Sequence, residues 1–274
     1  MKPAKFDYLN PDNIDQVLDC LAEYNDDARI MAGGLSFMAM INFRLIQPKV
    51  VIDISRLTEL AFIRVKGGFV EIGAATTQAD LKAWPDIDQK LPLVALALRH
   101  VGHFQTRSRG TVCGSICHAE PSSELPLSLA TLGGEVILRS KKGERVLKAS
   151  EFQIGMLANA RHPDEMVYAV RFPVAKKGQG FAFNEIAERH GDFAIVAVAA
   201  VAEGNDVHIG VGGIADRPTV RKFGALTNEK LSEALNAFAW ELRGDTDIHA
   251  TAQYRRQLVR HLGQKTITEA LANV

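Results

Sequence analysis

The chain has 274 residues, of which 47% are hydrophobic and 23% charged, with 32 basic and 32 acidic side chains. This balance gives no general attraction to nucleic acid or to an anionic membrane, and the length allows two or three compact units. No run of about 18 apolar residues is present, and no apolar signal core follows the first residues. We therefore expect a cytoplasmic protein without a membrane span, and the near-zero net charge favours assembly with partners.

The first part of the chain predicts a small unit with parallel strands that ends near Ser55. Its pattern is helix, strand, glycine loop, helix, strand, which is typical of parallel strand pairs. Asn10 and Pro11 are expected to begin the first helix as N-cap and first-turn proline. The helices are expected at about 11–24 and 37–45, and the strands at 28–31 and 49–54.

A mixed unit with antiparallel strands is expected next. Two glycine-bearing turns predict β-hairpins, and Thr76 or Thr77 is expected to cap a short helix. Residues 103–115 are interpreted as a loop. The hairpins are expected over 62–74 and 135–148, a further strand over 166–172, and helices over 91–100 and 122–132.

The polar, glycine-bearing segment 175–180 predicts a domain boundary. We therefore expect an α+β fold with a two-part first domain, residues 1–176 (parts 1–55 and 56–176), and a C-terminal domain, residues 177–274. Three antiparallel strands and a helical bundle are expected in the second domain, with Leu231, Leu235, Phe238 and Leu242 on one helix face. The strands are expected over 180–188, 193–202 and 207–212, and the helices from Glu229, over about 247–262 and over 266–271.

Two glycine stretches carry the chemistry: Ala32-Gly33-Gly34-Leu35-Ser36, and Thr111-Val112-Cys113-Gly114-Ser115 after Arg109-Gly110. Glycine allows close approach of a ligand to backbone N–H groups, and a helix N-terminus favours an anion. A single Gly-Gly pair is more often only a turn. Two such stretches, each followed by a hydroxyl residue, favour a diphosphate held from two sides.

The three cysteines, Cys20, Cys113 and Cys117, are too few for a disulfide framework. Cys113, Cys117 and the adjacent His118 lack the further ligand that a tetrahedral metal site needs, so we expect no metal site. His118 is interpreted as a polar loop residue. We name no catalytic acid, base or nucleophile in this chain.

In these stretches the chain resembles the FAD-binding medium subunit of the molybdenum hydroxylases, the family of xanthine dehydrogenase-type and carbon monoxide dehydrogenase-type enzymes. The flavin domain of that family is of the vanillyl-alcohol-oxidase type. The resemblance covers essentially the whole length. Residues 32–36 match the family's AGGxS loop, and residues 111–115 match four of the five positions of its T-[IV]-G-G-[NS] loop. Residues 116–126 and 189–194 resemble two further family segments, of which the second lies near the flavin ring.

The resemblance implies that FAD is bound by residues of these segments. Glu120 would hold ribose hydroxyls, and Asp192 and Phe193 would lie near the ring, where Arg189 and Asp192 would form an ion pair. The full implied set is Ala32, Gly33, Gly34, Leu35, Ser36, Thr111, Cys113, Gly114, Ser115, Glu120, Asp192 and Phe193.

Four positions depart from the family pattern. Cys113 replaces a glycine, so its side chain would either crowd the diphosphate or point away. Leu35 replaces a frequent glutamine, which should matter little because the phosphate contacts come mainly from backbone N–H groups. Glu120 replaces aspartate and Phe193 replaces tyrosine.

The resemblance also implies partners: a small subunit with two [2Fe–2S] clusters and a large subunit with the molybdopterin cofactor, assembled as a dimer of heterotrimers, a heterohexamer. Electrons would pass from the clusters to FAD and then to NAD, a quinone, oxygen or a carrier protein. Two other functions stay open: a stand-alone flavoprotein oxidoreductase, and a non-enzymatic nucleotide-binding protein. The small C-terminal part counts against the first, whereas Cys113 and Leu35 leave room for the second.

Overall fold

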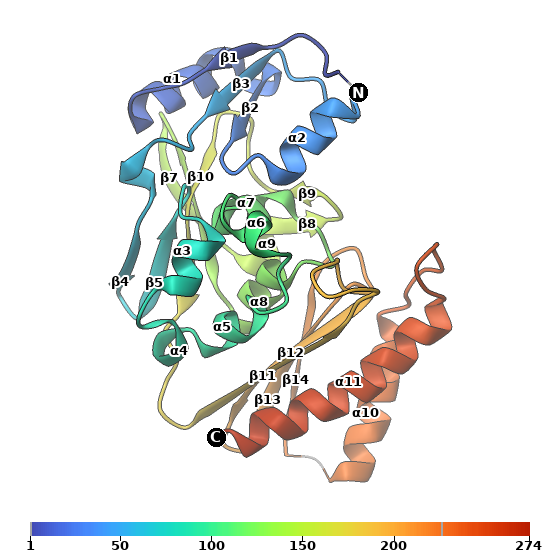
Figure 1. Cartoon of the computed structure of the whole chain (residues 1–274). Helices are drawn as coiled ribbons and strands as arrows, with labels where there is room; N and C mark the ends of the chain where they lie inside the picture. The colour runs from blue at the N-terminus through green and yellow to red at the C-terminus, as the bar shows by residue number, and fades with distance from the viewer. Residues whose placement is uncertain (1, 226) are drawn as a thin grey trace.

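The computed structural model describes residues 2–225 and 227–274 (Figure 1). The N-terminal part is a three-stranded parallel sheet of order β1-β3-β2, so the predicted parallel unit is confirmed. Helix α1 begins after Asn13, whose side chain accepts a hydrogen bond from the Gln16 N–H, so the predicted start at Asn10 and Pro11 was wrong. The elements are β1 (Asp7–Leu9), α1 (Ile14–Tyr24), β2 (Ala28–Met31), α2 (Leu35–Asn42) and β3 (Val50–Asp53), with a 3-10 turn at Asn25–Asp27.

The second part is a five-stranded antiparallel sheet of order β4-β5-β10-β6-β7. Both predicted hairpins are present in it, and Thr77 caps α3. The strands are β4 (Ile63–Lys66), β5 (Phe69–Gly73), β6 (Glu135–Ser140), β7 (Gly143–Lys148) and β10 (Met166–Pro173); a small separate hairpin is made of β8 (Gln153–Gly155) and β9 (Ala158–Asn159).

Seven short helices accompany this sheet, and α5 and α8 lie between it and the C-terminal part (Figure 1). The stretch expected to be a loop at 103–115 contains α6 and the beginning of α7, so that prediction was wrong. The helices are α3 (Gln78–Ala83), α4 (Ile87–Lys90), α5 (Pro92–Ala97), α6 (Phe104–Arg107), α7 (Val112–His118), α8 (Glu124–Leu132) and α9 (Ala149–Phe152), with a 3-10 turn at Thr58–Leu60.

The C-terminal part is a four-stranded antiparallel sheet of order β11-β12-β13-β14 covered by two helices. Three strands were predicted, and β14 was missed. The two helices predicted at 247–262 and 266–271 are one continuous helix, α11. The predicted apolar face of α10 is confirmed, since Leu231, Leu235, Phe238 and Leu242 are all buried. The bounds are β11 (Gln179–Ile186), β12 (Val196–Glu203), β13 (Asp206–Gly212), β14 (Thr219–Phe223), α10 (Asn228–Glu241) and α11 (Ala252–Ala272).

The two larger sheets are joined through α5 and α8. Leu93 and Ala97 of α5 and Leu127 of α8 form one apolar cluster with residues of β11 and β12. Helices α10 and α11 cover the opposite face of the C-terminal sheet (Figure 1). Among the described residues, none of the helices combines the length and the apolar character needed to cross a membrane.

Candidate functional site

The first glycine stretch forms the turn between β2 and α2. Gly34 is the N-cap of α2 and has φ of +75°, a left-handed conformation that glycine adopts without strain. Among the described residues, the backbone N–H groups of Gly33, Gly34, Leu35 and Ser36 donate to no other residue. Unpaired donors at a helix N-terminus are what an anion-binding group requires.

The second glycine stretch is the first turn of α7. Thr111 is its N-cap, and the Thr111 hydroxyl accepts a hydrogen bond of 3.0 Å from the Gly114 N–H. Gly114 is exposed, whereas Ser115 is half-buried. Among the described residues, the hydroxyls of Ser36 and Ser115 have no hydrogen-bond partner, so both can serve a ligand.

The structure brings the two stretches into direct contact. A Cβ atom on Gly33 would lie 2.1 Å from the Arg109 carbonyl oxygen and 2.9 Å from Gly110 Cα. Only glycine fits at this crossing, because both neighbours are backbone atoms that cannot rotate away. The two predicted halves of a diphosphate cradle therefore lie side by side, and their residues fit an anionic cofactor.

The Cys113 side chain points away from this cradle. It is 3% exposed, its thiol lies 3.4 Å from the Ile72 carbonyl oxygen, and it belongs to the core above the five-stranded sheet. Burial raises the pKa of this thiol far above its usual value. Cys113 therefore leaves the backbone of the turn free, and of the two predicted orientations the one pointing away holds. Leu35 is 42% exposed beside the unpaired N–H groups.

Glu120 follows the C-terminal end of α7. It is half-buried, and its carboxylate accepts a hydrogen bond of 3.3 Å from the Ser122 N–H. The neighbouring His118 is half-buried, and burial lowers the pKa of its imidazole, against the opposing charge of Glu120. One carboxylate oxygen of Glu120 accepts no hydrogen bond from the described residues and can take a ribose hydroxyl.

The third predicted segment, 189–194, connects β11 to β12 and lies against the segment before α6. A Cβ atom on Gly191 would lie 3.0 Å from the His103 ring and 3.1 Å from the Gly102 backbone. Phe193 is 57% exposed. Arg189 and Asp192 are joined only by a backbone hydrogen bond, so within the described residues the predicted ion pair is absent.

Two side chains at the site carry no sequence signal that would have revealed them. Gln153 and Asn159, both in the β8–β9 hairpin, donate to carbonyl groups at the end of α7. An amide that donates to a backbone carbonyl far along the chain has no local pattern. The three cysteines are free, and among the described residues no cluster of histidine, cysteine or acidic side chains could hold a metal ion.

Two family models match the chain. The model described as the FAD binding domain in molybdopterin dehydrogenase matches residues 4–175, and the CO dehydrogenase flavoprotein C-terminal domain matches residues 181–270. The chain is an FAD-binding medium subunit of the molybdenum hydroxylase family. The resemblance and the α+β fold expected from the sequence are thereby confirmed, and FAD is the cofactor of this family's domain.

Relatives agree with this assignment, one of them over nearly the whole length of both chains. The 6-hydroxypseudooxynicotine dehydrogenase complex subunit alpha of Paenarthrobacter nicotinovorans is 34% identical, covering 99% of this chain and 96% of the relative. The caffeine dehydrogenase subunit beta of Pseudomonas sp. (strain CBB1) is 38% identical, covering 78% of this chain and 73% of the relative. A solved structure of carbon monoxide dehydrogenase from Hydrogenophaga pseudoflava, which lacks the Mo-pyranopterin moiety, superposes with a TM-score of 0.94 at 27% identity, covering 100% of this chain and 99% of that chain.

Proposed function

We propose that the chain is the FAD-carrying electron-transfer subunit of a heteromeric molybdenum hydroxylase, through which electrons pass from the [2Fe–2S] clusters of a small subunit to an external acceptor. The observation that carries this proposal is the contact of Gly33 with Arg109 and Gly110, because it places the unpaired N–H groups of the first stretch beside the first turn of α7. When bound, FAD supplies the redox chemistry, whereas the protein binds and orients it.

The proposed contacts follow from the geometry of the chain's own residues. The unpaired N–H groups of the first stretch and the Cys113 N–H in the first turn of α7 would hold the diphosphate, with the hydroxyls of Ser36 and Ser115 beside them. Glu120 would accept hydrogen bonds from ribose hydroxyls. Asp192 and the exposed Phe193 would border the ring. The whole proposed set is Ala32, Gly33, Gly34, Leu35, Ser36, Thr111, Cys113 (through its backbone), Gly114, Ser115, Glu120, Asp192 and Phe193.

The names of the relatives support a partnered subunit. One is a subunit of a named complex, and the matched structure lacks a moiety of a molybdenum cofactor. Their names refer to 6-hydroxypseudooxynicotine, caffeine and carbon monoxide, which supports a substrate that is selected outside this chain. The proposed assembly is a dimer of heterotrimers with an iron–sulfur small subunit and a molybdopterin large subunit. The three free cysteines support a reducing, cytoplasmic compartment.

The domain boundary at 176/177 is part of the proposal. The two family models end and begin at residues 175 and 181, on either side of it. The first domain would then hold both glycine stretches and Glu120, while the second domain supplies Asp192 and Phe193.

Capture of the tagged chain from its native host tests the proposal. Flavin, iron and molybdenum are quantified per chain, and the spectrum is recorded before and after chemical reduction. We expect flavin close to one per chain, with iron and molybdenum in the same complex. Stoichiometric flavin without iron and molybdenum would identify a stand-alone flavoprotein, and a colourless complex would identify a non-enzymatic protein; either result overturns the proposal.

A further inference from the structure

The C-terminal end of α7 is held by the β8–β9 hairpin. The last carbonyl groups of a helix have no partner within the helix. Here the Cys117 carbonyl accepts a hydrogen bond of 2.7 Å from the Asn159 side-chain amide. The Ala119 carbonyl accepts one of 2.9 Å from the Gln153 side-chain amide and one of 3.0 Å from the Leu157 N–H. The hairpin therefore takes the place of the missing next turn.

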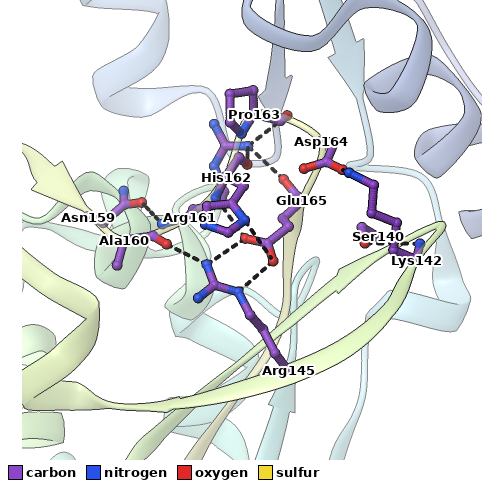
Figure 2. Close-up of polar contacts among 10 residues, drawn as sticks. All are labelled: Ser140, Lys142, Arg145, Asn159, Ala160, Arg161, His162, Pro163, Asp164 and Glu165. Carbon is purple, nitrogen blue, oxygen red and sulfur yellow. Dashed lines mark hydrogen bonds and ion pairs between the residues drawn. The ribbon is translucent and has the colours of Figure 1, made fainter.

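The orientation of the Asn159 amide is determined by its neighbours. The Arg161 N–H donates to the Asn159 side-chain oxygen at 3.1 Å, so the amide NH₂ faces the end of α7. Figure 2 shows how the following turn is fixed. The Arg161 guanidinium donates to the carbonyl groups of His162, Pro163 and Glu165 at 2.8, 3.2 and 2.6 Å.

The same turn is anchored to the five-stranded sheet by an ion pair whose carboxylate is buried. Arg145 of β7 donates to both carboxylate oxygens of Glu165, at 2.6 and 2.8 Å, and to the Ala160 carbonyl at 2.5 Å (Figure 2). Glu165 is 6% exposed. Burial of this carboxyl favours its neutral form, but Arg145 and the His162 N–H outweigh burial and hold the pKa below its usual value. The support for Asn159 therefore stays charged and intact through the mildly acidic range.

Gln153 is fixed in a similar way. It is 7% exposed, and its backbone carbonyl accepts a hydrogen bond of 3.4 Å from Arg217 of the C-terminal domain. Its amide and that of Asn159 thus approach α7 from a hairpin that Arg145 and Arg217 hold by hydrogen bonds. Because α7 is a single seven-residue element, a shift at its C-terminal end moves the glycine turn at its N-terminal end.

We propose that Gln153 and Asn159 are positioning residues of the flavin site. By holding the Cys117 and Ala119 carbonyl groups they set the position of α7, and so keep its first turn against Gly33. Neither side chain needs to touch the cofactor. This inference rests on the proposed function, since it assumes that the two glycine stretches hold FAD.

The test uses the variants Asn159→Asp and Gln153→Glu in the chain purified with whatever partners accompany it and stripped of flavin. Each variant keeps the shape of the side chain but replaces the donating NH₂ with an acceptor. Titration with FAD, followed by quenching of flavin fluorescence and by the visible spectrum, gives the dissociation constant. We expect a weakening of at least about ten-fold at pH 7.5, because the carbonyl loses its donor and meets a negative charge.

The pH dependence separates positioning from general damage. Burial against a carbonyl favours the protonated, donating form of this aspartate, so Asn159→Asp should bind FAD more tightly, relative to wild type, at pH 5.5 than at pH 7.5. The charged and titratable groups around this position are Arg161, Glu165, Arg145, His162 and the Cys117 thiol. The wild-type protein carries the same neighbouring groups and is titrated with FAD at both pH values. The recovery is therefore the change in the ratio of variant to wild-type dissociation constants between the two pH values.

Asn273→Asp is the matched control. The Asn273 side-chain amide donates to the Phe181 carbonyl at 3.1 Å in the C-terminal domain, away from α7. We expect it to change the melting temperature without changing FAD affinity. Unchanged affinity in both test variants, no recovery at pH 5.5, or an equal loss in Asn273→Asp would overturn the proposal while leaving the proposed function standing. Failure of the wild-type protein to bind FAD would overturn both.

Discussion

Gly33 is the residue at which the two halves of the proposed flavin cradle meet. Its absent side chain allows the Arg109 carbonyl to approach, and a Cβ atom would lie only 2.1 Å from that oxygen. We predict that Gly33→Ala moves the two stretches apart and weakens FAD binding by at least about ten-fold, or about 1.4 kcal/mol. Visible absorbance retained after desalting measures the effect.

Gly224→Ala provides the control for this substitution. Gly224 has φ outside the left-handed region, and a Cβ atom there would have one neighbour within 4 Å, the Asp206 carboxylate at 3.8 Å. The Gly224→Ala substitution should therefore leave FAD binding and the free energy of unfolding nearly unchanged. Full flavin retention by Gly33→Ala would show that the contact of the two stretches is not needed for the cofactor.

The Cys113 side chain is expected to stabilise the core and not to bind the ligand. We predict that Cys113→Ala lowers the free energy of unfolding by about 1–2 kcal/mol, because a small buried side chain and its contact with the Ile72 carbonyl are lost. The FAD dissociation constant should stay within about two-fold, since the backbone N–H groups remain. Urea unfolding and FAD titration measure the two quantities. A large change in affinity without a change in stability would place the thiol at the ligand.

For individual residues, the sequence predicts which of them lie close together but not where each side chain points. Gly33, Gly34 and Thr111 are recognisable because backbone conformation and capping depend on the residue itself. The orientation of Cys113 depends on α7, and that helix was not predicted. The stretch from Thr111 to Ser115 is rich in residues that favour caps and turns over helices, so only the capping bonds and packing stabilise it.

At the scale of elements, α8 places an acidic side chain where water is excluded. Glu124 is the first residue of α8 and is buried. Burial, together with the charge of Glu185, raises the pKa of Glu124 to about 8. Glu185 is itself nearly buried and lies 3.2 Å from the His100 ring nitrogen, so two acidic groups share the junction of the domains.

This carboxyl predicts a pH-dependent stability. The unfolded carboxyl titrates near pH 4.3, so between about pH 5 and 8 the unfolded chain has lost the proton that the folded protein retains. Stability therefore falls as pH rises through this range, by up to about 1.4 kcal/mol per pH unit from this group. We predict that Glu124→Gln removes this slope and is most stabilising, relative to wild type, near pH 8.

Urea unfolding at several pH values measures the difference between wild type and Glu124→Gln. Glu233→Gln, a change of the same charge on the exposed side of α10, is the control and should run parallel to wild type. Parallel curves for wild type and Glu124→Gln would show that the buried carboxyl is ionised in the folded protein.

The boundaries of helices and strands were predicted where the apolar pattern is strong. They were missed where packing against distant residues determines the boundary. The two hairpins and the apolar face of α10 follow directly from period and turn residues. Two helices were predicted over 247–262 and 266–271, but α11 continues through the gap between them. A Cβ atom on Gly263 would lie 2.8 Å from Leu235 of α10, so glycine here allows the two helices to pack closely. Strand β14 is an edge strand with basic residues and lacks a clear apolar alternation.

At the scale of the whole molecule, the two domains share an apolar cluster and should unfold together. The cluster joins Leu93, Ala97 and Leu127 of the first domain to residues of β11 and β12. A shared core of this kind removes the independent boundary between folding units. The sequence predicted the domains separately and gave no sign of this junction, because the contacts join residues roughly a hundred positions apart.

Gly210 of β13 allows that junction to close. A Cβ atom there would lie 2.0 Å from the Thr131 hydroxyl oxygen and 3.0 Å from Leu127, both on α8 of the other domain. We predict that Gly210→Ala weakens the junction by about 1–3 kcal/mol, because overpacking forces the two layers apart. The cores of the individual domains are left unchanged.

The chain has two tryptophans, Trp84 in the first domain and Trp240 in α10, so fluorescence can report on each domain separately. The Trp240→Phe protein reports on the first domain and the Trp84→Phe protein on the C-terminal domain. In the otherwise unchanged chain, these two proteins should give coincident urea transitions. In the Gly210→Ala background the two transitions should separate. Gly263→Ala, which overpacks α11 against α10 inside one domain, is the matched control and should lower stability without splitting the transition. Separate transitions in the proteins without Gly210→Ala would mean that the shared cluster does not couple the domains. The two domains would then unfold independently of each other.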